Sequence, residues 1–333
     1  MTSQFLPGPA NQNLEPEKTK PKHLHRDWSG ATIGLLFGMA GLFAGRLGQL
    51  WIGFDIFAQF WIQFVFLTLA CALGMVSPRY KSLVGAVLFL SMIAGYSAWP
   101  YVVSSGVAEK FTEIKSGERI LKVASFNTYA ENQDSVAVVK EIARLDADVI
   151  TLVELNQKTL SALPQLRSQY PYQQDCFSTL DCDFAILSKY PLSDVVSKTY
   201  YEGAPYFHAS LGPAFGNTTI IAIHTNRFPH QRSQLKQVLG LVKHIETIHG
   251  PVVLMGDFNA TPFSRIPQTI ADGAGLVRLT NLPSWTATYG FPQLAIDHIF
   301  VSPQIHALDH ERIGEYAGSD HFPITITLAV PAK

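Results

Sequence analysis

The sequence predicts a protein in two parts: three membrane-spanning helices, followed by a domain of mixed strands and helices. The first observation behind this expectation is composition. Only 15% of the 333 residues are charged, and the mean hydropathy is positive, at +0.13. The second is distribution, because residues 28–103 are almost uncharged, whereas in residues 119–333 apolar runs of strand length alternate with segments of helical periodicity.

Three apolar runs carry the prediction of membrane helices. They lie at about residues 31–52, 56–76 and 83–103, and each is long enough to cross a hydrocarbon core of ~30 Å. Few formal charges occur between Trp28 and Val103: Arg46, Asp55, Arg79 and Lys81. Because Arg46 interrupts the first run, we expect its side chain to reach the membrane interface where that helix ends near Gly45.

The segments that flank the apolar region are polar. Residues 1–27 are rich in Pro, Asn, Lys and Glu without apolar periodicity, which predicts a disordered cytoplasmic tail. Residues 104–118 are expected to form a linker. Two other interpretations of the apolar region are a cleaved signal peptide and a buried helix bundle. The long polar leader argues against the first, and the succession of three runs argues against the second.

Basic residues predict the orientation of the spans. The tail carries four Lys or Arg residues between Lys18 and Arg26, and the loop between the second and third runs carries Arg79 and Lys81. Lys and Arg accumulate in cytoplasmic loops, so the N-terminus and this loop are expected in the cytoplasm. Three spans then place the C-terminal domain outside. We therefore predict a multi-pass protein of the cell inner membrane with an extracytoplasmic domain.

Two features of that domain bear on its surroundings and ligands. Cys176 and Cys182 lie in one polar segment, where they form either a disulfide, which an oxidising compartment favours, or two unpaired thiols. From Lys110 to the end, 18 Lys and Arg stand against 21 Asp and Glu, a net charge of −3. This balance argues mildly against nucleic acid as the partner, since phosphate-binding surfaces carry an excess of basic residues.

Polar side chains recur where the predicted strands end. Asn127, Glu154, His224 and Asp257 each end or follow an apolar run of strand length. Strand ends present functional groups from a rigid sheet, and four such positions predict one site assembled from distant parts of the chain.

Two Asp-His pairs near the C-terminus extend this set: Asp297-His298 and Asp320-His321. A group rich in carboxylates and amides suits Mg²⁺ or Mn²⁺ better than zinc. The sequence has no HExxH or CxxC motif for zinc, no phosphate-binding GxxxxGK[ST] loop and no GxSxG nucleophile elbow. A hard cation among carboxylates polarises a phosphoryl oxygen and stabilises the leaving group.

Seven short segments, in this order, resemble the endonuclease/exonuclease/phosphatase superfamily over about residues 120–330. They are Ser125-Phe126-Asn127, Val153-Glu154, Ala185-Ile186-Leu187-Ser188, Ile223-His224, Gly256-Asp257-Phe258-Asn259, Ile296-Asp297-His298 and Ser319-Asp320-His321-Phe322-Pro323. The resemblance implies the deoxyribonuclease-I-like fold, an α+β four-layer αββα sandwich of two packed β-sheets flanked by helices. Its other members include neutral sphingomyelinases and inositol-polyphosphate phosphatases.

The same resemblance implies a metal centre. Glu154 is the expected ligand of a Mg²⁺ or Mn²⁺ ion, with Asn127 and Asp320 helping directly or through water. Tyr129 stands where some relatives place an acid for a second metal, so a two-metal site is in question.

The resemblance also implies the groups that act on the phosphate. Asp257 is expected to orient or deprotonate the attacking water, and Asn259 to donate a hydrogen bond to the scissile phosphate. Asp297 would orient His321, which contacts the phosphate. His224 matches a histidine that diester-cleaving members use as a second phosphate contact and general acid.

These expectations favour a membrane-anchored, metal-dependent hydrolase of a phosphodiester, phosphomonoester or pyrophosphate. The three spans resemble membrane-embedded bacterial members linked to glycopeptide resistance, which points to a lipid-linked or cell-envelope phosphate as substrate and the lipid bilayer as partner. Two alternatives stay open: a membrane-anchored endonuclease or exonuclease, and a non-catalytic interaction module on the same fold.

Overall fold

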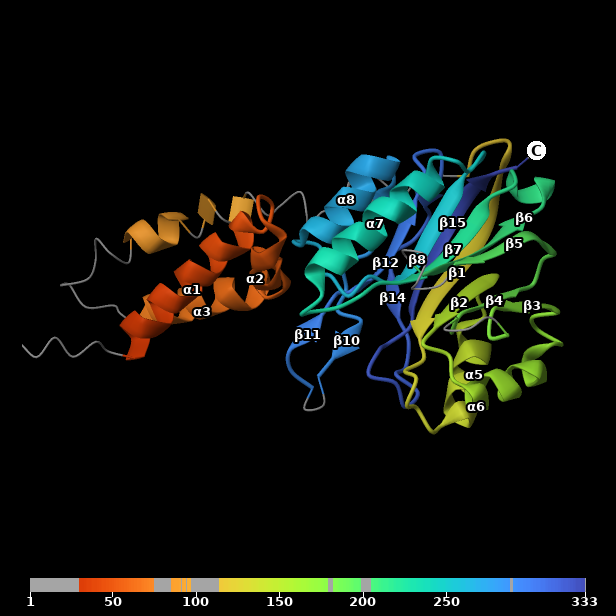
Figure 1. The fold of residues 1–333 in the computed structure, drawn as a ribbon, viewed down its shortest axis with the longest axis horizontal. Coiled ribbons are helices and arrows are strands. Elements are labelled where there is room, and N and C mark those ends of the chain that lie inside the picture. Colours follow the sequence, from red (N-terminus) through yellow and green to blue (C-terminus); the bar gives the residue numbers. More distant parts are fainter. Residues whose placement is uncertain are drawn as a thin grey trace, which may run out of the picture.

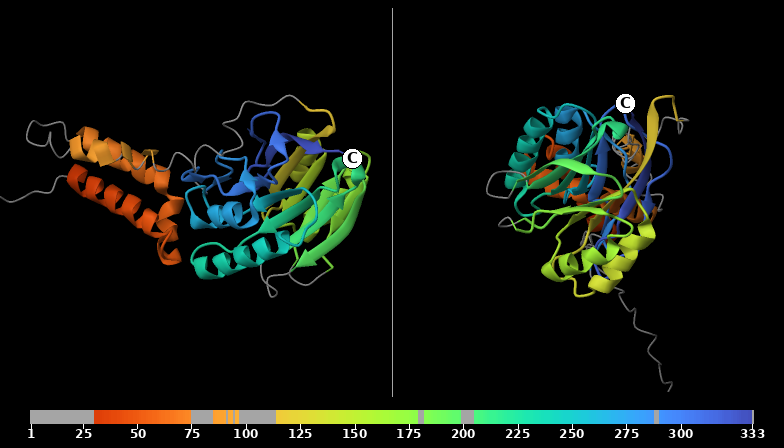
Figure 2. Two further views of the ribbon diagram at one scale, coloured as in Figure 1. Left: turned by 90° about the horizontal axis from the view of Figure 1, so that it is seen from above. Right: turned by 90° about the vertical axis from the view of Figure 1, so that its right-hand side faces the viewer.

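The computed structural model describes residues 30–74, 85–90, 92–93, 95–96, 114–178, 182–198, 205–287 and 290–332. A layer of helices from the N-terminal region lies against one end of a larger domain that contains two β-sheets (Figures 1 and 2). The predicted tail at residues 1–27 and most of the predicted linker lie outside the described residues.

The first sheet follows the order β13-β15-β1-β2-β4-β3, with β14 paired to β15. Its strands are β1 (Glu118–Asn127), β2 (Val149–Val153), β3 (Tyr172–Asp175), β4 (Ala185–Ser188), β13 (His306–Ala307), β14 (Arg312–Ile313) and β15 (Ile324–Pro331). Strands β1 and β2 run parallel at the centre of this sheet, and β15 pairs antiparallel with the other edge of β1.

The second sheet follows the order β5-β6-β7-β8-β12-β9. Its strands are β5 (Leu192–Lys198), β6 (Tyr206–Leu211), β7 (Thr219–His224), β8 (Val252–Asp257), β9 (Val277–Arg278) and β12 (Asp297–Val301). Strands β7 and β8 are the parallel central pair. A separate ribbon joins β10 (Trp285–Thr286) to β11 (Gln293–Leu294).

The two sheets pack face to face and helices cover their outer faces. Val123 and Ile186 of the first sheet share one buried cluster with Ala222 and Met255 of the second. Helices α5 (Ser135–Leu145) and α6 (Gln157–Ala162) pack on the first sheet, and α7 (Gln231–Ile245) and α8 (Arg265–Ala274) on the second. The expected αββα sandwich is therefore confirmed.

Local chemistry explains where two of the predicted helices begin and end. Asp134 is the N-cap of α5, and its side chain accepts a hydrogen bond from the Ala137 N–H. The helix after β2, α6, is short and is followed by a 3₁₀ turn, Leu163–Leu166. Pro164 lies at the start of that turn. Because proline lacks the N–H that would continue the helix, α6 ends before it.

The N-terminal region differs from the prediction of three spans. Helix α1 (Gly30–Leu47) is the one described helix long and apolar enough to cross a membrane by itself, a property that it shares with signal sequences and buried core helices. The segments Ile52–Gln59 and Trp61–Gly74 pass this test only as a pair bent by 61°. The predicted third span, residues 83–103, falls partly outside the described residues.

The break in the second run has a structural reason. The expected span began at Ile56, but the chain forms a 3₁₀ turn η1 (Ile52–Phe54), then α2 (Asp55–Gln59), and turns at Phe60 into α3 (Trp61–Gly74). Asp55 is completely buried, and its hydrogen bond to Ser264 fixes α2 against the sandwich, at an angle to α3. The first run ends at Leu47, as the position of Arg46 predicted, and the Arg46 guanidinium lies 5.9 Å from the Trp61 ring centre.

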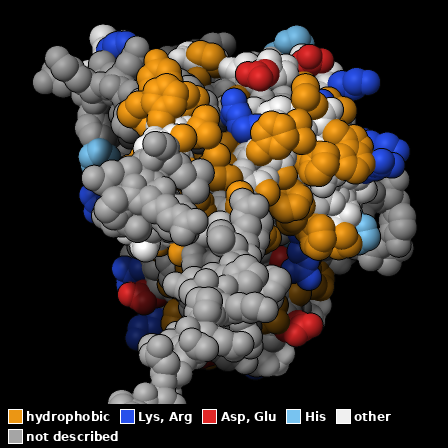
Figure 3. Space-filling model, turned by 90° about the vertical axis from the view of Figure 1, so that its left-hand side faces the viewer, with side chains coloured by type: hydrophobic (Ala, Val, Ile, Leu, Met, Phe, Trp, Pro, Cys, Tyr) orange, Lys and Arg blue, Asp and Glu red, His pale blue; other side chains and the backbone are white. Residues whose placement is uncertain are grey.

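Helices α1 and α3 pack closely through small side chains. A Cβ atom at Gly38 would overlap the Thr68 hydroxyl, which itself donates to the Phe64 carbonyl at 2.7 Å. Their outward faces are apolar, with Phe37, Phe43 and Phe66 exposed. Figure 3 views the molecule from this end, where apolar side chains gather. A large exposed apolar surface of this kind is typical of a membrane or protein contact.

Candidate active site

The predicted site residues come together at one end of the sandwich, where strands of both sheets end. Asn127 ends β1 and Glu154 follows β2, its parallel neighbour. In the second sheet His224 and Asp257 are paired at the ends of β7 and β8. Asp297, the first residue of β12, pairs with Asp257 from the other side of β8. The expectation that strand ends meet in one site is correct.

Asn127 holds the two central carboxylates. Its buried Nδ2 donates to Glu154 Oε1 at 2.9 Å and to Asp257 Oδ2 at 3.0 Å. Its Oδ1 accepts from the Tyr129 N–H at 3.0 Å. The reversed amide would set an oxygen against two carboxylates, so this orientation is the one that satisfies every partner. Asn127 therefore positions Glu154 and Asp257, and its predicted part in binding a metal stays a prediction.

Backbone conformation aims the Glu154 carboxylate into the site. Glu154 has φ of 50°, in the left-handed region that residues other than glycine seldom adopt. Asn259 and Tyr129 also have positive φ, at 46° and 61°. Backbone strain of this kind gathers at functional sites, where the surrounding structure maintains it.

His321 is held by Asp297. Its Nδ1 lies 2.8 Å from Asp297 Oδ2, and the same oxygen accepts from Ser284 Oγ at 2.6 Å. The opposite ring nitrogen, Nε2, lies 3.6 Å from Asp257 Oδ2. Since Asp297 fixes Nδ1, Nε2 is directed at the cluster, as predicted.

Asp320 is held in position by the indole of Trp285. Trp285 Nε1 donates to Asp320 Oδ2 at 3.0 Å, and Trp285 forms a β-bridge with His321. The Asp320 side chain is 38% exposed, and its Oδ1 lies 4.0 Å from His321 Nε2. It thus presents one carboxylate oxygen from the rim, consistent with the predicted metal role.

The loop after β8 is built by its own motif. Gly256 has φ of 149°, and a Cβ there would overlap the Ile223 carbonyl, so the position requires glycine. Asp257 Oδ1 accepts from the Asn259 N–H at 2.7 Å. Asn259 Nδ2 donates to the Thr225 carbonyl at 2.9 Å, which leaves one amide hydrogen for a phosphate. Gln234 of α7 stabilises this loop, because its Nε2 donates to the Phe258 carbonyl at 2.8 Å.

His224 closes the cluster from the second sheet. Its Nε2 lies 3.3 Å from Glu154 Oε1 and 3.9 Å from Asp257 Oδ2. His298, although next to Asp297 in the sequence, is completely buried, and its Nε2 lies 2.8 Å from the Ala260 carbonyl oxygen, so it supports the strand.

Burial and crowding shift the titration of the central groups. Burial raises the pKa of Asp257 to about 6, and the nearby Asp297 and Glu154 add to the rise. Burial lowers the pKa of His321, but Asp297 and Asp257 outweigh it and raise the value to about 10. Burial also raises the pKa of Asp183, a neighbouring acid. At neutral pH His321 is therefore a cation among carboxylates.

These donors fit a hard divalent cation. Within the described part of the chain, Glu154, His224 and Asp257 offer ligand atoms within 4.8 Å of one another, and so do Asp257, Asp297 and His321. His321 and Asp297 are already bonded to each other, so the better place for a cation is beside Glu154, the predicted ligand. Crowded carboxylates repel each other, and a cation would offset that repulsion. The identity of the metal remains the prediction of Mg²⁺ or Mn²⁺.

The cluster forms one wall of a cleft of about 660 Å³. The lining includes Glu154, His224, Asp257, Asn259, Asp320 and His321. The rest of the lining combines polar side chains such as Glu131 and Arg227 with apolar ones, Phe228 and Leu294 from the sandwich. Ile56 and Phe60 of the N-terminal region also line it.

Sequence reasoning missed the residues that support the predicted ones. Ser284 and Trp285 hold Asp297 and Asp320, yet they belong to an irregular segment without a strand or helix pattern. Asp183 lines the cleft, and its neighbour Cys182 could have drawn attention to it. Cys176 and Cys182 form a disulfide, one of the two states that the sequence left open, with Cα atoms 5.5 Å apart.

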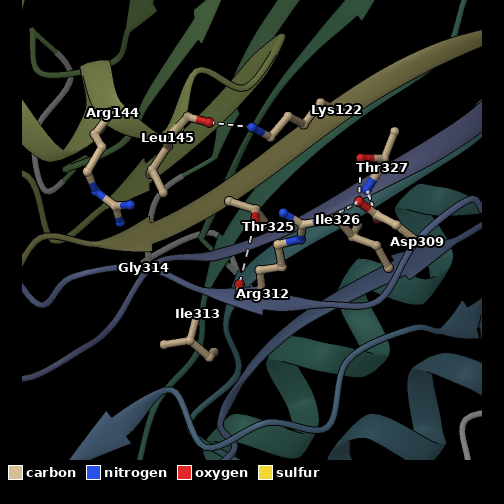
Figure 4. Close-up of a pocket in the computed structure, with 10 residues that line it drawn as sticks. All are labelled: Lys122, Arg144, Leu145, Asp309, Arg312, Ile313, Gly314, Thr325, Ile326 and Thr327. Carbon is tan, nitrogen blue, oxygen red and sulfur yellow. Dashed lines mark hydrogen bonds and ion pairs between the residues drawn. The ribbon is translucent and has the colours of Figure 1, made fainter.

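A second cavity, of about 410 Å³, lies between β1, β15 and the end of α5 (Figure 4). Its cations have partners: Lys122 Nζ donates to the Leu145 carbonyl at 2.6 Å, and Arg312 lies 3.8 Å from Asp309. Arg144 pairs with Glu141 at 2.7 Å. These contacts tie the edge of the sandwich together, so we assign this cavity a structural role.

The model of the Endonuclease/Exonuclease/phosphatase family matches residues 124–321. The chain belongs to this family. The match includes every predicted site residue, from Asn127 to His321. Since the family unites nucleases with phosphatases, its shared chemistry is hydrolysis of a phosphoric ester. Curated protein sequences gave no significant match.

Solved structures share the fold of this family member at low identity. The humanized TDP2 of D. rerio is 16% identical with a TM-score of 0.53, covering 63% of this chain and 98% of its own. An endonuclease/exonuclease/phosphatase from Beutenbergia cavernae is 19% identical with a TM-score of 0.51, covering 64% and 72%. ANGEL2, a 2′,3′-cyclic phosphatase, is 16% identical with a TM-score of 0.51, covering 65% and 97%.

Proposed function

We propose that this family member is a membrane-anchored, divalent-metal-dependent hydrolase of a lipid-linked or cell-envelope phosphate outside the cytoplasm. The observation that carries the hydrolase assignment is the joined cluster Glu154–Asn127–Asp257–His321–Asp297, which opens onto a cleft. A non-catalytic module has no need of a buried imidazolium among carboxylates, because burying such charges costs free energy.

The side chains divide the chemistry among them. Glu154, with Asp320 from the rim, would hold the cation, which when bound supplies Lewis-acid stabilisation of the phosphoryl oxygens. Asp257 orients the attacking water and accepts its proton. His321, charged and fixed by Asp297, donates a hydrogen bond from Nε2 to a phosphate oxygen. His224 reaches the phosphate from the second sheet, with Asn259 as a further donor.

Three observations support the membrane setting. Helix α1 satisfies the length and hydropathy of a span, and the apolar runs at about residues 56–76 and 83–103 carry the sequence prediction of two more. Because α2 docks on the sandwich, the turn between the first two helices lies on the same side as the domain, in agreement with the orientation inferred from Lys and Arg. The Cys176–Cys182 disulfide supports an oxidising compartment.

The test is hydrolysis by the full-length chain in detergent, purified without metal. Substrates would be polyprenyl pyrophosphate, bis-p-nitrophenyl phosphate and duplex DNA, each with and without Mg²⁺ or Mn²⁺. We expect metal-dependent release of phosphate from the lipid, lost in Asp257→Asn. Cleavage of DNA alone would replace the lipid substrate with nucleic acid, and no turnover with any metal would refute the hydrolase.

A further inference from the structure

The turn between the first two N-terminal helices is anchored on the sandwich by buried polar contacts. Asp55 is completely buried, and its Oδ2 accepts from Ser264 Oγ at 2.5 Å. Its Oδ1 accepts from the Arg265 N–H at 2.8 Å. A buried carboxylate is stable only with such donors. Here they are the N-cap residue and first N–H of α8, so Asp55 completes the cap of a helix about two hundred residues away in the sequence.

Further contacts fix the rest of this turn. Gln59 Oε1 accepts from the Thr261 N–H at 2.6 Å, and Thr261 Oγ1 donates to the Ala58 carbonyl at 3.2 Å. The Trp61 ring stacks on Phe263, with centres 6.1 Å apart and planes inclined by 20°. Polar and apolar contacts together therefore make α2 a fixed part of the domain surface rather than a loose connection.

The same turn presents side chains to the cleft. Ile56, Gln59 and Phe60 line the cavity that also contains Glu154 and His321. Phe228, 58% exposed, lines it from the sandwich. The cleft thus has two chemical zones: charged groups for a phosphate, and an apolar rim built jointly by the domain and the N-terminal turn.

From this arrangement we propose that Ile56 and Phe60 are specificity-determining residues that contact the hydrocarbon part of an amphiphilic phosphate. Asp55 is the positioning residue that fixes them. This proposal rests on the function proposed above. The helices that continue from this wall, α1 and α3, carry exposed apolar faces, so a hydrocarbon chain leaving the cleft past Phe60 passes directly onto apolar surface. A phosphate ester without a hydrocarbon chain would bury less apolar surface against this wall.

The experiment compares two substrates in the full-length chain. Polyprenyl pyrophosphate carries a hydrocarbon chain, and bis-p-nitrophenyl phosphate is a soluble ester. Phe60→Ala should lower kcat/KM for the lipid roughly tenfold more than for the soluble ester, mainly through KM, as expected for a lost apolar contact. The matched control is Phe57→Ala, in the preceding helix α2 but outside the cleft lining, which should leave the ratio between the substrates unaltered.

Thermal unfolding of each variant would separate misfolding from specificity, because a folding defect lowers activity on both substrates alike. An equal loss on both substrates, or none on either, would overturn this proposal while the proposed hydrolase function stands. If the wild-type chain hydrolysed only the soluble ester, the lipid substrate class itself would fall, and the role of Phe60 with it.

Discussion

The N-terminal helices and the αββα sandwich are both rich in apolar residues but arrange them in opposite ways. In α1 and α3 large apolar side chains such as Phe37 and Phe66 face outward, and small ones such as Gly38 lie between the helices. In the sandwich, apolar side chains fill the interior, and the buried acids Asp257 and Asp297 gather at one end. The first arrangement suits a membrane contact and the second suits catalysis, so each region supplies what the other lacks.

The two regions meet at α2, and that junction is where their roles can be separated experimentally. Changes in the cluster should abolish chemistry without disturbing the helices. Changes at α2 should instead affect stability and substrate choice.

The largest effect is expected from Glu154→Gln, which removes the charge of the best metal ligand. We expect kcat to fall by roughly 10³-fold at saturating Mg²⁺, with little change in thermal stability. Glu246→Gln, at an exposed position after α7, is the matched control. Activity within about tenfold of wild type would show that Glu154 does not hold the metal.

Next comes Asp297→Asn, which should lower kcat by about 10²-fold because His321 loses the partner that fixes and charges it. Asp297 raises the pKa of His321 toward about 10, so its loss should let the imidazolium lose its proton at lower pH. The alkaline limb of the rate profile should therefore move to lower pH. An unshifted limb would mean that another group governs the activity at alkaline pH.

Asp55→Asn tests the junction. Ser264 and Arg265 donate to different carboxylate oxygens, and an amide places an NH₂ donor at one of these two positions, so we expect the loss of about 2 kcal/mol of unfolding free energy. Denaturant unfolding monitored in the sandwich would measure it. Asp272→Asn is the control: Asp272 is exposed on α8, the helix that Asp55 caps, and its replacement should have little effect. Equal stability of the two variants would contradict the docking of α2.

The smallest effect concerns His208, which lies in β6 away from the cluster. Neither ring nitrogen has a hydrogen-bond partner among the described residues, and burial lowers its pKa from 6.5 to about 4. Between these two pH values the unfolded chain binds more protons at His208 than the folded chain does. The free energy of unfolding is therefore unaffected by His208 above pH 6.5 and falls as the pH drops toward 4.

Replacing the imidazole of His208 with an apolar ring should remove the free-energy cost of burying its two ring nitrogens without hydrogen-bond partners. His208→Phe should stabilise the protein by about 1 kcal/mol at neutral pH and reduce the acid-side loss. Unfolding free energies measured across the acid range would check both effects. Unaltered acid sensitivity would assign it to other groups, such as His298, whose pKa burial lowers to about 3.

The sequence revealed much of the site because Asn127, Glu154, His224 and Asp257 each end or follow a recognisable strand. Asn127, His224 and Asp257 end apolar runs, so their convergence followed from topology alone. Ser284 and Trp285 carry no such signal, since they act through contacts with residues distant in sequence.

The apolar N-terminal region was predictable in composition but not in geometry. Hydropathy identified the runs, yet the bend at Phe60 depends on Asp55 meeting Ser264 and Arg265, a tertiary contact that no local pattern encodes. Asp55, a single acid within an apolar stretch, was the local sequence signal that this segment departs from a straight membrane helix.

The most direct test of the central claim, that the metal centre and the N-terminal turn share one cleft, uses paramagnetic Mn²⁺. A fluorinated thiol tag would be attached to Phe60→Cys, and to Leu73→Cys at the far end of α3 as a control, in full-length chains in which Cys71→Ser removes the free thiol. We predict that Mn²⁺ strongly broadens the fluorine signal at position 60, much less at position 73, and neither when Glu154→Gln is added. Equal broadening at both positions, or none at position 60 while Mn²⁺ binds, would contradict the account.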